Sequence, residues 1–124
     1  MGLWDNLIIK KNINNIRYYK YMVALKMEPN KPKDPNNMTD FEKKHTPAIE
    51  ISGNKFIVKV GEGIVHPMEE DHYIQYIELL KDNESIAKKE LKPGDEPKAE
   101  FENITLGNLK AQALCNLHGL WESV

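Results

Sequence analysis

Cysteine is almost absent from this chain: Cys115 is the only one in 124 residues. A single cysteine cannot form an internal disulfide, so we expect a reducing compartment, with the cytoplasm as the default. Strong charge is absent too, since a net charge of −2 gives no electrostatic basis for binding nucleic acid or an anionic membrane. No apolar run approaches the ~18 residues of a membrane-spanning helix, and the apolar residues 7–9 end at Lys10, so we expect no signal peptide.

The first 40 residues differ in composition from the remainder. Isoleucines within residues 9–16 have roughly helical spacing, but the asparagines among them lower helix propensity. Three prolines among asparagine, lysine and aspartate at 29–35 are typical of a linker. We therefore predict a flexible or partner-dependent extension and linker over residues 1–40, without a cysteine cluster, and one domain over residues 41–124.

From residue 41 onward, short runs rich in β-branched and aromatic residues alternate with turn-forming residues such as Asp82-Asn83. The runs that we interpret as strands cover residues 48–51, 56–60, 73–80, 86–91, 98–104 and 109–115. This spacing predicts an all-β fold, an immunoglobulin-like antiparallel β-sandwich of about seven short strands with an irregular N-terminal extension. A core of ~80 residues buries limited apolar surface, so we expect metal binding and oligomerisation to add stability.

Histidine is also scarce, and all four histidines can be assigned to one site together with the single cysteine. Cys115 and His118 are three positions apart, with Gly119 relieving the backbone just beyond, so both can reach one metal ion. His66 and His72 flank an acidic loop that can present ligands and anchor the groups around them. The candidate ligands are therefore His45, His66, His72, Cys115 and His118.

Other interpretations of these five residues explain fewer of them. A lone histidine in a β-protein is usually a surface or hydrogen-bonded residue, and a lone buried cysteine usually acts as a small hydrophobe. A structural zinc site closes at four ligands, and the iron site of many oxygenases uses two histidines and a carboxylate. A blue-copper site could use Met68 but would leave two histidines idle. An octahedral iron with one free position uses all five.

Four stretches of the chain, "KKHTPAIE", "KVGEGIVHPMEEDHYIQYIELL", "LKPGDEP" and "CNLHGLW", resemble in order and spacing the iron domain of superoxide reductases, the family of desulfoferrodoxin and neelaredoxin. The resemblance covers residues 42–121. It implies a mononuclear non-haem iron (Fe²⁺/Fe³⁺), one per chain, in an immunoglobulin-like sandwich. It also implies the one-electron reduction of superoxide to hydrogen peroxide with uptake of two protons.

The resemblance further implies a role for each candidate residue. The equatorial ligands would be His45, His66, His72 and His118, and the axial ligand would be Cys115. Lys44 would attract superoxide and stabilise the developing peroxide. The family commonly has a glutamate two residues before the first histidine, where it caps the oxidised iron; here Lys43 stands there and Glu42 lies one residue further out. In an extended segment that displacement reverses the side chain's face, so Glu42 would reach the iron only from a flexible loop.

The same resemblance implies a rubredoxin-like electron donor and a homo-oligomer, either a dimer or a tetramer. Longer family members carry an additional iron module bound by four cysteines, which residues 1–40 cannot build because they contain none. Two alternatives stay open at this point. One is superoxide dismutation at the same site, and the other is a non-catalytic iron module for electron transfer or metal binding.

Overall fold

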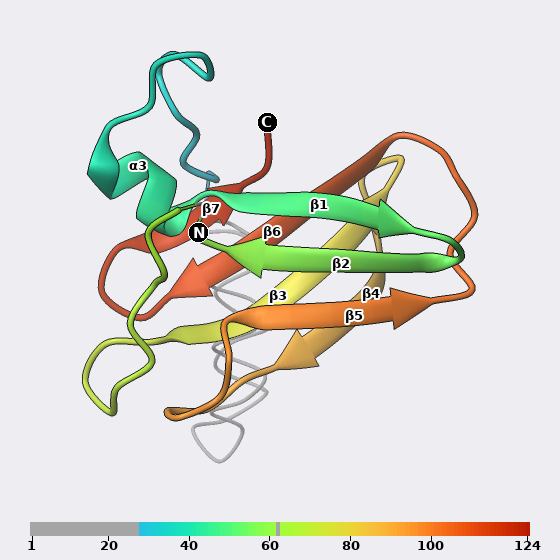
Figure 1. The fold of residues 1–124 in the computed structure, drawn as a ribbon. Helices are drawn as coiled ribbons and strands as arrows, with labels where there is room; N and C mark the ends of the chain where they lie inside the picture. The colour runs from blue at the N-terminus through green and yellow to red at the C-terminus, as the bar shows by residue number, and fades with distance from the viewer. Residues whose placement is uncertain (1–27, 62) are drawn as a thin grey trace, which may run out of the picture.

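The computed structural model describes residues 28–61 and 63–124, so the weak helical pattern at residues 9–16 lies outside the described part. Within these two ranges, seven strands form two antiparallel sheets packed face to face (Figure 1). One sheet has the order β1-β2-β5 and the other β4-β3-β6-β7. The elements are α3 (Asp40–His45), β1 (Pro47–Ser52), β2 (Lys55–Val60), β3 (Ile74–Lys81), β4 (Glu84–Glu90), β5 (Lys98–Glu102), β6 (Leu109–Cys115) and β7 (Gly119–Glu122). The predicted β-sandwich is confirmed.

The strands follow from the alternation of the sequence. Phe56, Val58 and Val60 of β2 are buried, while Lys55 and Lys59 of the same strand are exposed. This pattern is expected for a sheet with one face on the core. β3 and β4 are joined by the predicted turn, in which Asp82 and Asn83 have φ of 50° and 68°. Two consecutive residues in the left-handed region are the geometry of a tight hairpin whose twist matches that of its strands. Aliphatic side chains from both sheets fill the space between them.

The segment before β1 differs from the prediction, which treated the chain from residue 41 as strands and short turns. Residues Asp40–His45 form the helix α3 instead. Its first turn is a capping box: the Thr39 hydroxyl accepts from the Glu42 N–H, and the Glu42 carboxylate accepts from the Thr39 N–H. The spacing of Thr39 and Glu42 is the sequence signature of a helix start, and the prediction overlooked it.

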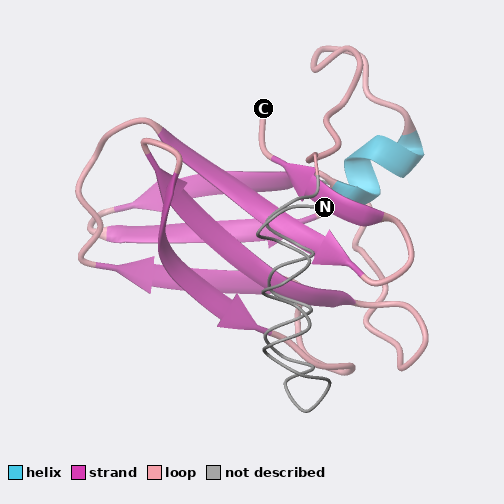
Figure 2. Cartoon of the chain, turned by 180° about the vertical axis from the view of Figure 1, so that it is seen from behind, coloured by secondary structure: helices cyan, strands magenta, loops and turns pink. Residues whose placement is uncertain are grey.

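α3, the loop between β2 and β3 and the turn between β6 and β7 gather at one end of the sandwich (Figures 1 and 2). Three segments that are far apart in the sequence therefore meet at this end. In the described residues, no helix has the length and apolar character needed to cross a membrane.

Candidate metal centre

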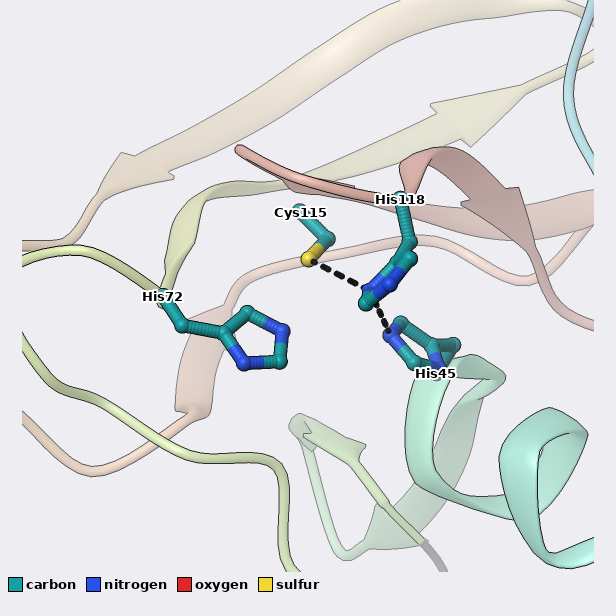
Figure 3. Close-up of side chains that lie close together, drawn as sticks. All are labelled: His45, His72, Cys115 and His118. Carbon is teal, nitrogen blue, oxygen red and sulfur yellow. Dashed lines mark hydrogen bonds between the residues drawn. The ribbon is translucent and has the colours of Figure 1, made fainter.

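The predicted ligands come from the three segments that meet at the end of the sandwich. His45 ends α3, His72 lies in the loop before β3, Cys115 ends β6, and His118 lies in the turn that follows. These four side chains point toward one another (Figure 3). Each offers one ligand atom, and the four atoms lie within 4.8 Å of one another.

His66 is the fifth predicted ligand, and its ring lies against the same group. Its ring centroid is 4.8 Å from those of His45 and His72. The residue is only 1% exposed. The structure thus brings all four imidazoles and the single thiol to one end of the sandwich, although the His66 ligand atom is outside the tightest group of four.

Backbone carbonyls fix the orientation of two of the rings. Nδ1 of His45 donates to the Phe41 carbonyl at 2.7 Å, and Nδ1 of His66 donates to the Pro67 carbonyl at 2.7 Å. A carbonyl can only accept, so the proton of each neutral ring is on Nδ1 and Nε2 carries the lone pair. A hydrogen bond of this kind orients a metal-ligating histidine and selects its tautomer.

The free nitrogens fit a metal ion. Nε2 of His66 and Nε2 of His72 are buried and have no hydrogen-bond partner among the described residues, an arrangement that is costly unless something binds there. Nε2 of His45 lies 3.1 Å from Nδ1 of His118. Two nitrogens at right angles around one ion, each about 2.1 Å from it, are about 3.0 Å apart. Imidazole and thiolate donors together favour a transition metal over calcium or magnesium.

Burial keeps these imidazoles uncharged. Removal from water is the largest cause that lowers the pKa of His66, from 6.5 to about 4; the neighbouring rings and Lys44 lower it further, and the Pro67 carbonyl opposes them. Burial is also the largest cause of the lowered pKa values of His45 and His72. Neutral imidazole is the form that binds metal, so these three residues are in their ligand form at neutral pH.

Two aromatic residues that the sequence interpretation did not single out surround His45. Trp121 stacks on the His45 ring at 5.2 Å with an interplanar angle of 28°, and Phe41 packs on it at 4.4 Å. The indole N–H of Trp121 also donates to the His118 carbonyl at 3.1 Å. Phe41 could have been found from its spacing, because it precedes His45 by four residues and so shares its face of the helix.

The Asn116 side chain makes contacts beside the site that the sequence interpretation did not anticipate. Its side-chain amide donates to the Asp71 carbonyl at 3.0 Å, and its Oδ1 accepts from the Tyr73 N–H at 2.9 Å. These bonds connect the turn that follows Cys115 to the loop that carries His72. The connection depends on tertiary contact, and no local sequence signal indicates it.

The charged residues near His45 lie in three different environments. Lys44 directly precedes His45 and is half-buried, and its charge is among the smaller causes that lower the pKa values of His45, His66 and His72. Lys43 is exposed. Glu42 accepts backbone N–H groups with both carboxylate oxygens, from Thr39 at 2.9 Å and from Lys33 at 3.0 Å, and these bonds lower its pKa.

Comparison with known proteins gives consistent matches over this part of the chain. The desulfoferrodoxin family model matches residues 37–124. A desulfoferrodoxin homolog from Archaeoglobus fulgidus is 48% identical over 96 residues, which cover 77% of this chain and 74% of that protein. The crystal structure of the superoxide reductase from Treponema pallidum matches with a TM-score of 0.60 at 32% identity, covering 69% of this chain and 68% of that one. The superoxide reductase (1Fe-SOR) from Giardia intestinalis matches with a TM-score of 0.59 at 36% identity, covering 65% of this chain and 95% of that one.

Proposed function

The chain belongs to the desulfoferrodoxin family, and we propose that it is a superoxide reductase, an oxidoreductase that reduces superoxide to hydrogen peroxide. The observation that carries this proposal is the convergence of the ligand atoms of His45, His72, Cys115 and His118 within 4.8 Å. The buried, unpartnered Nε2 of His66 beside them supports a fifth ligand. The proposed metal ligands are therefore His45, His66, His72, Cys115 and His118.

The proposed metal is one iron ion per chain; held by these five residues, it would supply the one-electron redox chemistry that the reduction of superoxide requires. The protein's own contribution is to hold the donor atoms in their binding form. The carbonyls of Phe41 and Pro67 keep the protons of His45 and His66 on Nδ1. Cys115 is 1% exposed and belongs to the apolar core, so its sulfur approaches the site from the interior and away from water.

Lys44 is proposed to guide the substrate. Superoxide is an anion, and a positive charge beside the site raises its local concentration and speeds its capture. The same ammonium can stabilise negative charge that develops on the substrate oxygen atoms and can hydrogen-bond to them. Its half-buried position and its effect on the pKa values of three histidines support this role.

The proposal extends to the surroundings of the enzyme. A turnover that consumes one electron per superoxide requires a reductant, and we propose a small rubredoxin-like protein that docks at the exposed end of the sandwich. We further propose that the chain acts as a homo-oligomer in a reducing, cytoplasmic compartment, where the single free cysteine would stay reduced.

The test begins with metal content and a visible spectrum of the purified protein before and after oxidation. One iron per chain and a charge-transfer band that appears on oxidation are expected. Superoxide is then supplied together with a reduced donor, and donor oxidation is counted against superoxide lost. One donor electron consumed per superoxide without oxygen evolution supports the reductase. Oxygen evolution without donor consumption would instead establish a dismutase. A stable iron site that does not react with superoxide would indicate a non-catalytic metal-binding module.

A further inference from the structure

Residues 30–33, which we call the strap, precede the matched family region and lie on the sandwich. The Asn30 N–H donates to the Leu120 carbonyl at 2.7 Å, and the Glu122 N–H donates to the Asn30 carbonyl at 3.0 Å. Asn30 thereby forms a parallel bridge with Trp121. The strap therefore extends the sheet beyond β7, the strand that directly follows the turn carrying His118.

Two side chains anchor the strap. Lys31 forms an ion pair with Glu122 at 2.9 Å, and the Glu122 side chain is only 6% exposed. Gln112 donates to the same carboxylate at 3.0 Å. Burial raises the pKa of Glu122, but the bonds from Lys31 and Gln112 outweigh it, so the net pKa is lowered and the carboxylate is ionised. Removing Lys31 would leave a buried carboxylate without its cation, which is more costly than losing an exposed pair. The following residue, Pro32, is buried.

The other end of the strap is bonded to α3. The Lys33 N–H donates to Oε2 of Glu42 at 3.0 Å, while Oε1 of Glu42 closes the capping box with Thr39. The strap thus joins β7 to the helix that ends in His45. Four residues thus connect the helix that carries His45 to the strand that directly follows His118.

The Asn30 side chain reaches the ligand turn itself. Its amide nitrogen donates to the Leu120 carbonyl at 3.1 Å and lies 3.5 Å from the His118 carbonyl. The Trp121 indole donates to the same His118 carbonyl. The His118 carbonyl therefore accepts from the Trp121 indole and lies at the limit of hydrogen-bond distance from the Asn30 amide.

We propose that the strap holds the metal ligands His45 and His118 in place, and that Asn30 is a positioning residue for His118. This inference rests on the proposed ligand set but not on superoxide chemistry. The composition of this segment is typical of a linker, whereas the proposal makes the segment a support for the metal ligands. Positioning of this kind acts on the metal, because small changes in ligand orientation alter both affinity and electronic properties.

The test compares Asn30→Ala with Asn36→Ala. Asn36 lies in the same segment, and its bond in the described structure runs from its backbone N–H to Asp34, so the substitution leaves that bond in place. The iron-loaded proteins are challenged with a ferrous chelator, and the oxidised forms are examined by visible and EPR spectroscopy. Losing one or two hydrogen bonds predicts that Asn30→Ala releases iron about fivefold faster and shifts the thiolate charge-transfer band or the EPR signal. Asn36→Ala should match the wild type in both.

A second pair of variants tests the anchor of the strap. Lys31→Met removes the partner of the buried Glu122, whereas Lys59→Met removes an exposed ion pair with Glu50. Faster iron release in Lys31→Met alone is expected. Wild-type iron release and spectra in both Asn30→Ala and Lys31→Met would overturn the proposal, even if their melting temperatures fell, because a purely structural role predicts that result.

Hydrogen exchange on the metal-free protein separates this proposal from the proposed function. Asn30→Ala should speed exchange in residues 116–120, and Asn36→Ala should not. If the wild type fails to bind iron, the proposed function is wrong, and hydrogen exchange alone then tests whether the strap positions the turn. Unchanged exchange of residues 116–120 in Asn30→Ala would then refute the proposed role of the strap.

Discussion

Acid should destabilise the metal-free protein through His66 in particular. The pKa of this residue falls from 6.5 to about 4 in the folded state, with burial as the largest cause. Between these values the unfolded chain binds a proton at this position that the folded chain does not bind. The contribution of His66 to stability is therefore present above pH 6.5 and is lost as the pH falls through about 4.

The size of the effect follows from the same values. Each pKa unit corresponds to about 1.4 kcal/mol, so the whole fall from 6.5 to about 4 corresponds to about 3.5 kcal/mol, of which about 3 kcal/mol is lost by about pH 4. His66 is 1% exposed, so solvent screening does not reduce this figure greatly. That is a large part of the stability of a small domain.

The assay is urea unfolding of the metal-free wild type and of His66→Gln, which cannot titrate, at about pH 8 and about pH 4. The wild type should lose about 3 kcal/mol more than the variant on acidification, because His45 and His72 titrate in both proteins. Equal losses in the two proteins would refute the reasoning and would show that the folded protein accepts a proton on His66 without penalty.

Three further predictions concern the residues around the metal. Lys44→Ala should slow superoxide capture several-fold, most visibly at low ionic strength, while iron stays bound; stopped-flow kinetics with Lys43→Ala as the control should show a smaller effect for the exposed Lys43. Cys115→Ser should abolish the thiolate charge-transfer band of the oxidised protein, and a band that persists would remove Cys115 from the ligand set. Glu42→Gln should lower the melting temperature by weakening the helix cap and should leave the spectrum of the oxidised iron unchanged.

The sandwich could be predicted because its determinants are local. Alternating residues such as Phe56, Val58 and Val60 determine which face of β2 is buried, and Asp82-Asn83 tolerate the left-handed backbone that a tight hairpin requires. The candidate ligands could be listed for a different reason. With one cysteine and four histidines in the chain, the sequence offers few alternative sets.

The strap could not be predicted because its structure comes from distant partners. Three prolines in seven residues are typical of a linker, yet Pro32 is buried and the backbone of Asn30 is bonded to β7. Lys31 gives no sign in the sequence of its pairing with Glu122, 91 positions further along. Composition describes how a segment would behave in isolation, and these contacts exist only once β7 is in place.

The sequence interpretation questioned whether Glu42 reaches the metal because it expected an extended segment there, but the segment is helical. An extended segment would turn Glu42 to the face opposite the expected ligand position, whereas α3 puts it three residues before His45 and on the same side of the helix. The orientation of the Glu42 side chain on the helix therefore does not prevent it from reaching a metal ion beside His45. Its hydrogen bonds do, because binding a metal would require both oxygens to leave the N–H groups of Thr39 and Lys33, which would open the cap of α3 and detach the strap. We infer that Glu42 stabilises the helix that presents His45 and does not act as a metal ligand.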